Sequence, residues 1–290
     1  ALDATVTVAD IGIPRAAAEF VGPGDLQRLG RDPSSYKGEH GEVLVIGGGP
    51  YTGAPALAAQ AALRAGADLV RVACPTSVAH EIQGYSEDII VRPMEGREFE
   101  PGHVGPVMEF ANEHEVLVIG PGLGERDQTL EATRAILEGY DGTAVVDADA
   151  LQVVPRAETS ATIIGTPHRG ELVQMGGRTS EDWRERRALV ESFAADLGAT
   201  LLVKGHYDVI SDGETTRVSR TGNSGMTVGG TGDVLAGVTG ALAARHEPIH
   251  AAAMAAYANG RAGDAVHEER GDGLVASDLL DAIPAVLWES

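Results

Sequence analysis

A glycine-rich stretch between Gly222 and Gly237 holds the residue types best suited to chemistry in this 290-residue chain. From Val234 onward its pattern is that of a buried helix, so the first helical turn would span Gly230 to Asp233. The unpaired backbone N–H groups of a helix N-terminus, together with the positive end of its dipole, attract anions. Glycine also lets the backbone approach a ligand closely, because no Cβ intervenes. The stretch therefore predicts a phosphate-binding turn that needs no basic side chain.

Asp233 places a carboxylate in that same turn, and two interpretations compete. An acidic residue there stabilises the helix dipole by roughly 0.3–1 kcal/mol, which is reason enough for its presence. Beside a bound phosphate, however, the charge is repulsive. A function that outweighs the repulsion is the removal of a proton from a hydroxyl that attacks the phosphoryl group. We therefore interpret Asp233 as a candidate general base.

Four more sets of residues each follow a short apolar run that predicts a core strand. Ligands of open α/β sheets bind beyond the carboxyl ends of such strands, so each set is a candidate part of one site. The sets are Gly120 to Gly124, Asp147 with Asp149, Thr166 to Glu171, and Lys204 to Asp208.

Each set also has a purely structural interpretation, and the glycine loop could be a plain tight turn. Asp147 and Asp149 could hold magnesium through water or cap the short helix expected at Ala150, and a cap is the better interpretation of Asp149. Lys204 is one of only two lysines among the 22 basic residues, which favours a phosphate contact over a random surface charge. Among the nine histidines, His168 stands out because it follows a core strand beside a proline turn.

Strand-like runs alternate with helical patterns along most of the chain. Continuous apolar strands are typical of parallel sheets whose two faces are both covered. We therefore predict an α/β fold with a doubly wound, mostly parallel sheet and helices on both faces. A hairpin of residues 207–211 and 216–219 leads into the glycine-rich stretch. The other predicted strands are residues 42–46, 69–74, 116–119, 143–146, 161–165 and 200–203, and the other predicted helices are 55–66, 104–114, 128–138, 180–197, 250–268 and 277–287.

The composition is strongly acidic, with 43 Asp and Glu residues and a net charge of −21. This charge argues against nucleic acid or an anionic membrane as a partner. It favours a salt-adapted surface, although an ordinary acidic enzyme remains the alternative. The single cysteine, Cys74, excludes a disulfide or a zinc–thiolate site within the chain. No apolar run approaches the roughly 18 residues of a membrane span, so we expect a soluble, cytoplasmic protein.

The stretch from Asn223 to Gly237 resembles the signature of the NAD(P)H-hydrate dehydratases, members of the ribokinase-like superfamily. Its Gly-x-Gly-Asp core alone would suggest only a small-molecule kinase of that superfamily. Three further segments also match: Gly120-Pro121-Gly122-Leu123-Gly124, Asp147-Ala148-Asp149-Ala150-Leu151, and Thr166-Pro167-His168 with Glu171. The resemblance implies a ribokinase-like dehydratase domain over residues 37–290. Residues 1–36, which contain the strand-like run Ala4 to Pro14, are similar to a linker or to the tail of an epimerase domain fused ahead of the dehydratase in bifunctional repair proteins.

The resemblance also implies roles for individual residues. Asp233 would be the catalytic base, and Glu171 would lie near the metal or the phosphate. The substrate contacts would be Ala54, Gly122, His168 and Asp233. The nucleotide and phosphate contacts would be Lys204, Gly205, His206, Tyr207, Asp208, Asn223, Gly229, Gly230, Thr231 and Gly232. The chain departs from the family at Arg169, where proline is usual, in the turn beside His168.

The implied activity is that of a lyase that uses ADP, with Mg²⁺, to dehydrate the 6-hydroxylated hydrate of NADH or NADPH. The resemblance further implies a homo-oligomer, a tetramer in similar proteins. One alternative is a superfamily kinase acting on a thiazole or hydroxymethylpyrimidine alcohol; Asn223 to Met226 and Thr166 to His168 count against it. Another is a non-catalytic nucleotide-binding module, which retention of Asp233 beside the anion site disfavours. The residues leave open the choices between NADH and NADPH and between ADP and ATP.

Overall fold

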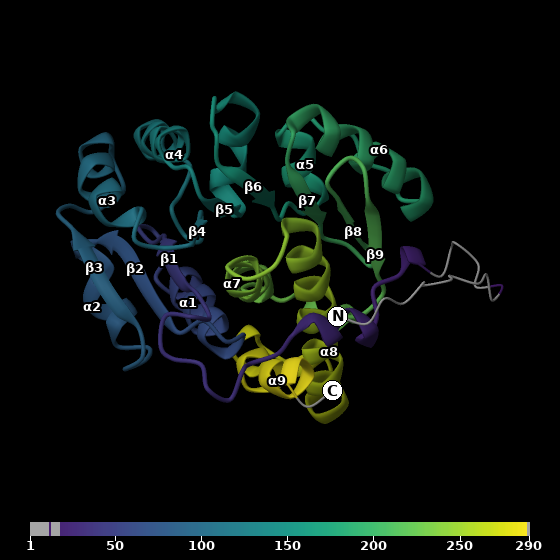
Figure 1. Cartoon of the computed structure of the whole chain (residues 1–290). Coiled ribbons are helices and arrows are strands. Elements are labelled where there is room, and N and C mark those ends of the chain that lie inside the picture. The colour runs from purple at the N-terminus through teal and green to yellow at the C-terminus, as the bar shows by residue number, and fades with distance from the viewer. Residues whose placement is uncertain (1–11, 13–17, 289–290) are drawn as a thin grey trace, which may run out of the picture.

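The computed structural model describes Gly12 and residues 18–288, and within them the strands form one nine-stranded sheet (Figure 1). The strand order is β3-β2-β1-β4-β5-β6-β7-β8-β9. The strands are β1 (Glu42–Ile46), β2 (Leu69–Pro75), β3 (Ile90–Met94), β4 (Val116–Ile119), β5 (Thr143–Val146), β6 (Thr162–Gly165), β7 (Thr200–Val203), β8 (Asp208–Ser211) and β9 (Thr216–Ser219).

Strands β1 to β7 pair in parallel, and only the β7–β8 and β8–β9 pairings are antiparallel. The predicted mostly parallel sheet and the predicted hairpin are therefore confirmed. Strand β3 was not predicted from the sequence. It is an edge strand that contains Pro93 and exposes most of its residues, so it lacks the continuous apolar run of a central strand.

Helices cover both faces of the sheet, as predicted. Figure 1 shows α3, α4, α5 and α6 on one face and α1, α7, α8 and α9 on the other. The helices are α1 (Gly53–Arg64), α2 (Thr76–Gln83), α3 (Val104–Ala111), α4 (Asp127–Gly139), α5 (Arg169–Gln174), α6 (Trp183–Leu197), α7 (Thr231–Ala243), α8 (Pro248–Arg270) and α9 (Ala276–Trp288).

Two hydrophobic cores result from this layering, one on each face. Successive side chains of a strand point to opposite faces, so Val43 and Val45 of β1 join one core while Leu44 and Ile46 join the other. All four side chains are completely buried. Central strands such as β1 and β4 are thus apolar at nearly every position, because helices cover both faces of the sheet there.

Helix α7 is buried from Val234 to Ala243 and packs against α1. The close approach depends on Gly237, because a Cβ there would lie 2.0 Å from the carbonyl oxygen of Ala58. Glycine at this position lets the two helix backbones touch. The packing fixes the first turn of α7 opposite the first turn of α1, and these two turns form part of the site described below.

Part of the chain before residue 37 packs against the domain. The N–H group of Val21 donates a hydrogen bond to the carbonyl oxygen of Val218 in β9, at 2.9 Å, and Leu26 is buried in the core. The predicted strand-like run from Ala4 to Pro14 lies outside the described residues, apart from Gly12. The domain boundary at residue 37 stays a prediction. Between residues 18 and 288, no helix has both the length and the apolar character that crossing a bilayer requires.

Candidate active site

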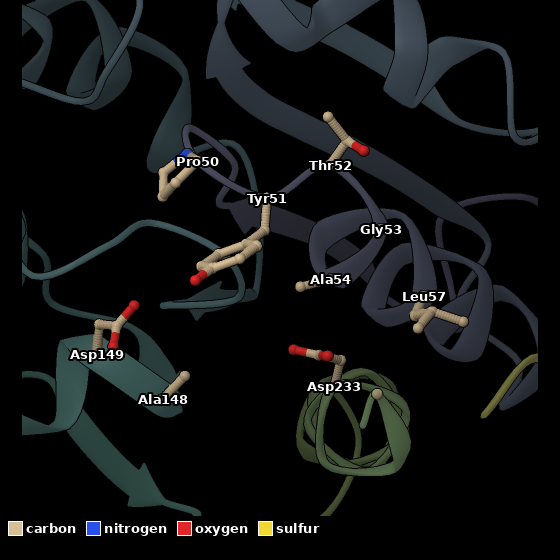
Figure 2. A pocket seen from close by; sticks show the side chains of 11 residues that line it. Pro50, Tyr51, Thr52, Gly53, Ala54, Leu57, Ala148, Asp149 and Asp233 are labelled. Atoms are coloured by element: carbon tan, nitrogen blue, oxygen red, sulfur yellow. The ribbon is translucent and has the colours of Figure 1, made fainter. Parts of the chain in front are cut away.

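A pocket of about 580 Å³ opens at the carboxyl edge of the sheet, beside the first turns of α1 and α7. It brings together four residues that were predicted from distant parts of the sequence: Ala54, Gly122, Gly230 and Asp233. In Figure 2 the Asp233 side chain projects from α7 towards Ala54. The remaining lining residues are Pro50, Tyr51, Thr52, Gly53, Leu57, Ala148 and Asp149.

Glycines allow the loops that line this pocket to lie against one another. Gly120, which ends β4, has φ +129, and a Cβ there would lie 1.8 Å from the carbonyl oxygen of Asp147. A Cβ on Gly47, at the end of β1, would lie 2.4 Å from the carbonyl oxygen of Pro121. Any other residue at either position would force neighbouring strand ends apart. The glycine-rich loop after β4 therefore packs closely against the neighbouring strand ends, and its Gly122 lines the pocket.

The N-terminus of α7 is open to an anion. Gly230 occupies the N-cap position with φ +100, and no side chain caps the first turn. The hydroxyl of Thr231 turns away and donates a hydrogen bond to the carbonyl oxygen of Met226 at 2.8 Å. The first N–H groups of the helix are thus not capped by a side chain, and the phosphate contact at this turn stays a prediction.

Asp233 lies in that turn and is partly buried. Burial raises the pKa of its carboxyl group to about 7, and the charges of Asp147, Glu171 and Asp149 add to the rise, while the Lys204 ammonium opposes it. A carboxylate with a pKa near the working pH is suited to accept a proton during a reaction. The geometry is therefore compatible with the predicted general base.

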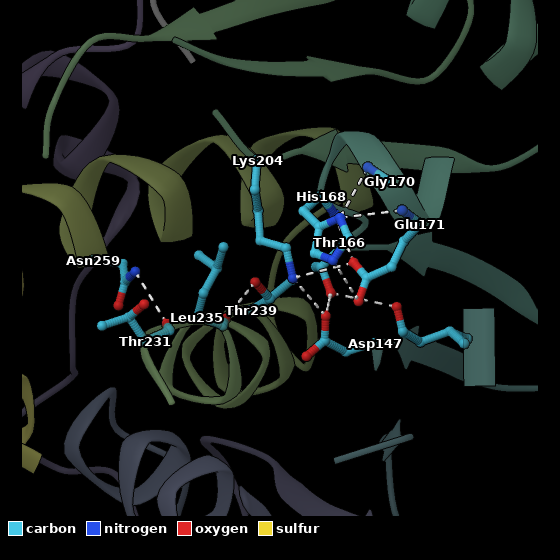
Figure 3. A network of polar contacts seen from close by, with 11 residues as sticks. Asp147, Thr166, His168, Gly170, Glu171, Lys204, Thr231, Leu235, Thr239 and Asn259 are labelled. Atoms are coloured by element: carbon cyan, nitrogen blue, oxygen red, sulfur yellow. Dashed lines mark hydrogen bonds and ion pairs between the residues drawn. The ribbon is translucent and has the colours of Figure 1, made fainter. Parts of the chain in front are cut away.

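Lys204 follows β7 and reaches back across the strand ends (Figure 3). Its Nζ atom lies 3.0 Å from Oδ1 of Asp147 and 3.7 Å from Oε2 of Glu171. Burial alone would lower the pKa of Lys204, but these two carboxylates outweigh it and the pKa is raised. A Cβ on Gly232 would lie 3.3 Å from Nζ, so the ammonium sits beside the first turn of α7.

His168 and Glu171 form a capping box at the start of α5. Nδ1 of His168 accepts hydrogen bonds from the N–H groups of Gly170 at 2.9 Å and Glu171 at 3.1 Å. Oε2 of Glu171 accepts one from the N–H group of His168 at 2.6 Å. The other ring nitrogen, Nε2, lies 3.5 Å from Oε1 of Glu171, and the His168 side chain is 59% exposed, so one side of the ring is open to solvent.

The loop from Gly205 to Asp208 is held by its own side chains. Oδ1 of Asp208 accepts a hydrogen bond from the N–H group of Gly205 at 2.9 Å, and burial raises the pKa of Asp208 to about 7. His206 is exposed and packs edge-on against Tyr207, whose ring lies 5.4 Å from that of Trp183. Nucleotide contacts by this loop stay a prediction.

Asn223 and Gly229 lie on the loop that precedes α7. Oδ1 of Asn223 accepts a hydrogen bond from the N–H group of Gly225 at 3.0 Å, and its Nδ2 donates to Asp264 at 3.1 Å. Gly229 is exposed just before the helix. Asn223 therefore shapes the loop, and its predicted contact with a nucleotide is likewise untested.

Two features of the pocket were not read correctly from the sequence. Asp149 was predicted to cap the helix at Ala150, but the 3₁₀ helix Ala148–Arg156 begins after Asp147, without a side-chain cap. Oδ2 of Asp149 instead accepts a hydrogen bond from the N–H group of Gly124 at 3.0 Å. Tyr51, 65% exposed on the pocket wall, was not singled out at all. Its position in the loop after β1, separated from Gly47-Gly48-Gly49 only by Pro50, was the available signal.

Among the described residues, no group of three or more His, Cys, Asp and Glu side chains is arranged to hold a metal ion. Glu171 is engaged with the His168 backbone and lies near Lys204. The carboxylates of Asp147, Glu171, Asp149 and Asp233 nevertheless influence one another at this edge of the sheet, opposed by Lys204. Such oxygen donors suit Mg²⁺, which commonly binds with its own waters and with phosphates and needs few protein ligands. The residues present therefore fit a magnesium ion that arrives with a nucleotide.

Comparison with known proteins places this geometry in a family. The family model described as NAD(P)H-hydrate dehydratase matches residues 43–285. The chain is 44% identical to the bifunctional NAD(P)H-hydrate repair enzyme Nnr of Pyrobaculum aerophilum, over 97% of this chain and 58% of that protein. It is 37% identical to the ADP-dependent (S)-NAD(P)H-hydrate dehydratase of Cenarchaeum symbiosum, over 93% and 97% of the two chains. The chain thus spans little more than half the length of the bifunctional relative.

Solved structures agree with the fold. The ADP/ATP-dependent NAD(P)H-hydrate dehydratase of Bacillus subtilis, co-crystallised with ATP/Mg²⁺, has a TM-score of 0.79 at 25% identity, covering 97% of this chain and 99% of that one. A ribokinase-like superfamily protein of Enterococcus faecalis has a TM-score of 0.82 at 23% identity, covering 93% and 95%, and shows likeness of fold alone. The predicted ribokinase-like fold is confirmed. With the family model covering residues 43–285, the chain belongs to the NAD(P)H-hydrate dehydratase family.

Proposed function

We propose that this chain is an ADP-dependent hydro-lyase that returns the 6-hydroxylated hydrate of NADH or NADPH to the intact dinucleotide. The observation that carries the proposal is the juxtaposition of Asp233, with its pKa near 7, and the uncapped N-terminus of α7 in one pocket. A proton acceptor and an anion site side by side suit the attack of a hydroxyl on a phosphoryl group. The ADP-dependent relative from Cenarchaeum symbiosum, matched over nearly its full length, supports ADP as the donor.

In the proposed reaction Asp233 takes the proton of the hydrate's 6-hydroxyl group as the oxygen attacks the β-phosphoryl group of ADP. The new O–P bond forms and the bond to the leaving AMP breaks, while the N–H groups of Gly230 to Gly232 hold the phosphoryl oxygens. The C–O bond of the phosphorylated ring then breaks, pushed by the lone pair of the ring nitrogen, and phosphate departs. Loss of a proton from the adjacent ring carbon restores the double bond. ADP and hydrate thus yield AMP, phosphate and NAD(P)H.

We assign the remaining predicted residues to parts of this reaction. Ala54, Gly122 and the outward face of His168 would contact the hydrate, while Lys204 and the loop from Gly205 to Asp208 would contact the nucleotide. Asn223, Gly229 and Thr231 would shape the turn that receives the phosphates. Glu171 would act near the phosphates through Lys204 and is not required as a direct metal ligand.

One assay distinguishes the proposal from its alternatives. Purified protein would be given hydrate and ADP, and both the hydrate's absorbance and the release of phosphate would be followed. A dehydratase consumes the hydrate and releases phosphate in equal amounts. A thiazole or hydroxymethylpyrimidine kinase would phosphorylate its own alcohol and leave the hydrate intact, and a non-catalytic module would do neither. Replacing ADP by ATP in the same assay decides the donor.

Turnover is expected to need magnesium. The phosphates of ADP would face four carboxylates and one lysine, so a divalent counter-ion would supply the positive charge that the chain lacks. Excess chelator should lower turnover by about tenfold or more, with recovery on adding Mg²⁺. Full activity in chelator would contradict this requirement while leaving the dehydratase proposal standing.

Stability is expected to rise with salt. With a net charge of −21, self-repulsion should weaken the folded state at low ionic strength, and screening should relieve it. Each kcal/mol regained would raise the melting temperature by roughly 2–4 °C for a domain of about this size. Thermal melts from dilute buffer to molar potassium chloride would test this, and an unchanged melting temperature would argue against a salt-adapted surface.

The wider organisation is also a proposal. Because the chain covers 58% of the Pyrobaculum aerophilum repair enzyme, a fused epimerase domain upstream is one arrangement in which this domain would work. Assembly of several copies of this chain is a second proposed arrangement. The mass of the native protein in solution would decide whether this chain assembles by itself.

A further inference from the structure

Asp147 is a buried carboxylate that takes no part in the bond-making and bond-breaking steps of the proposed reaction. It is 2% exposed and directly follows β5. Its Oδ1 atom accepts two hydrogen bonds, from the hydroxyl of Thr166 at 2.7 Å and from Nζ of Lys204 at 3.0 Å (Figure 3). A buried carboxylate is costly unless it is paired and hydrogen-bonded, and both conditions are met at this one oxygen.

The backbone around Asp147 is fixed as firmly as its side chain. Its N–H group donates to the carbonyl oxygen of Ile119 at 3.0 Å. Its own carbonyl oxygen lies 1.8 Å from the position that a Cβ on Gly120 would occupy, so it packs directly against that glycine. The N–H group of Thr166 donates to the carbonyl oxygen of Val146 at 3.0 Å. The ends of β4, β5 and β6 are therefore locked to one another, and Oδ1 of Asp147 has a set position.

Lys204 depends on that position. Its side chain has four rotatable bonds, and an unpartnered ammonium at the end of them would sample many conformations. The hydrogen bond to Asp147 keeps Nζ beside Gly232, in the turn of α7 that would hold the transferring phosphoryl group. Glu171 contributes less to this restraint, because it lies 3.7 Å from Nζ and its Oε2 is already bonded to the His168 N–H group.

We propose that Asp147 is a positioning residue for phosphoryl transfer: its Oδ1 holds the Lys204 ammonium at the first turn of α7, and Thr166 holds Asp147. The inference rests on the proposed function for its effect on catalysis, and on geometry alone for the restraint of Lys204. The Asp147 side chain is only 3% exposed and acts through Lys204. It is not assigned a contact with substrate or nucleotide.

The kinetic test is Asp147→Asn, which keeps the size of the side chain and an acceptor oxygen but removes the charge. With Lys204 misplaced, kcat should fall by about tenfold. The KM for ADP should rise by no more than about threefold, because Lys204 is only one of the proposed nucleotide contacts and the N–H groups at the start of α7 are unchanged. If Asp147 merely repelled the nucleotide, the same change would lower the KM for ADP and leave kcat intact, and the proposal would be overturned.

Thr166 supplies a matched pair of variants should Asp147→Asn fail to fold. Thr166→Val removes the hydroxyl that donates to Oδ1 at nearly constant volume, whereas Thr166→Ser retains it. Thr166→Val should lower kcat in the same way as Asp147→Asn but less, and Thr166→Ser should restore it. Equal kcat values for the two variants would count against the proposal, since a packing role would affect only their melting temperatures.

A second measurement needs neither substrate nor turnover. Lys37 and Lys204 are the only lysines in the chain, and Lys37 is exposed, so it serves as an internal reference. An amine-acylating reagent followed by mass spectrometry would give the ratio of their labelling rates. Asp147→Asn should raise the Lys204 rate relative to Lys37 severalfold, because the ammonium loses the hydrogen-bonded carboxylate that restrains it and raises its pKa.

The kinetic test and the labelling test together distinguish failure of the proposed function from failure of the positioning role. If wild-type protein consumes no hydrate but Asp147→Asn still exposes Lys204 to labelling, the proposed function falls and Asp147 still holds Lys204. If hydrate is consumed and neither kcat nor labelling responds to Asp147→Asn, the function stands and the positioning role is rejected.

Discussion

Replacing Asp233 by Asn is expected to slow the chemical step by roughly 10²–10⁴-fold, the usual contribution of a positioned general base. Asparagine keeps the size and hydrogen-bonding capacity of the side chain but cannot take up the proton. ADP binding should persist and could tighten, because one negative charge beside the phosphates is gone while the N–H groups of α7 remain. Single-turnover loss of the hydrate's absorbance, together with an ADP titration, measures both effects.

A matched control separates this role from that of a helix-dipole partner. Asp127 occupies the first turn of α4, is exposed and lies outside the pocket. Asp127→Asn should cost about 1 kcal/mol or less of stability and leave turnover intact. If Asp233→Asn behaves like Asp127→Asn, with turnover within a few-fold of wild type, Asp233 leaves the mechanism, and with it goes the main support for an enzymatic function.

The pH dependence of stability also distinguishes a general base at Asp233 from a helix-dipole partner. Because the pKa of Asp233 is about 7 in the folded protein against 3.8 for an ordinary aspartate carboxyl group, the folded form binds more protons between about pH 4 and pH 7. The contribution of Asp233 to stability therefore falls as the pH rises through that window, and above pH 7 its ionised form is a net cost. Asp233→Asn should be at least as stable as wild type at pH 8. If Asp233 were only a helix-dipole partner, Asp233→Asn would instead be less stable than wild type at pH 8.

The sequence predicts the scaffold well because the central strands are continuous apolar runs and each is followed by a distinctive loop. The strands at 42–46, 116–119 and 143–146 are observed with the predicted bounds. The rule that ligands of parallel sheets lie beyond the strand ends predicts the position of the loop that holds Gly122. Asp233 was predicted from the glycine-rich turn, and Ala54 only from the family resemblance. Strand β3 and helix α2 were missed because neither has that apolar signature.

The interactions that define the site chemically are less accessible to sequence reasoning. Lys204 and Asp147 are 57 residues apart, and the sequence around neither residue indicates that they pair. Asp149 appeared to be a helix cap because that is what an Asp before a short helix usually does, yet its partner is the N–H group of Gly124, 25 residues away. Such pairings follow from strand order and loop approach. They are fixed by glycines such as Gly120, whose tolerance for close contact cannot be judged until the neighbouring loop is known.

The rate of the chemical step is expected to rise steeply with pH up to about 7. The base must be ionised to act, and burial together with Asp147, Glu171 and Asp149 raises the pKa of Asp233 to about 7. Below that value the ionised fraction falls about tenfold per pH unit, so kcat should be about 100-fold lower at pH 5 than at its plateau. A kcat profile between pH 5 and 9, with stability checked at each point, would show the apparent pKa.

A second carboxylate could produce the same profile, and it must be separated from the first. The pKa of Asp208 is also raised to about 7 by burial, but Asp208 bonds to the Gly205 N–H group in the neighbouring loop and is absent from the pocket lining. Asp208→Asn should therefore keep the acid limb near pH 7, whereas Asp147→Asn should move it to lower pH by removing one of the charges that raise the pKa of Asp233. If Asp208→Asn abolishes the limb instead, the titrating group is Asp208, and Asp233 must already be ionised at pH 5. In that case the charges around Asp233 would not tune it as a base, and its part in the reaction would rest on the Asp233→Asn rate alone.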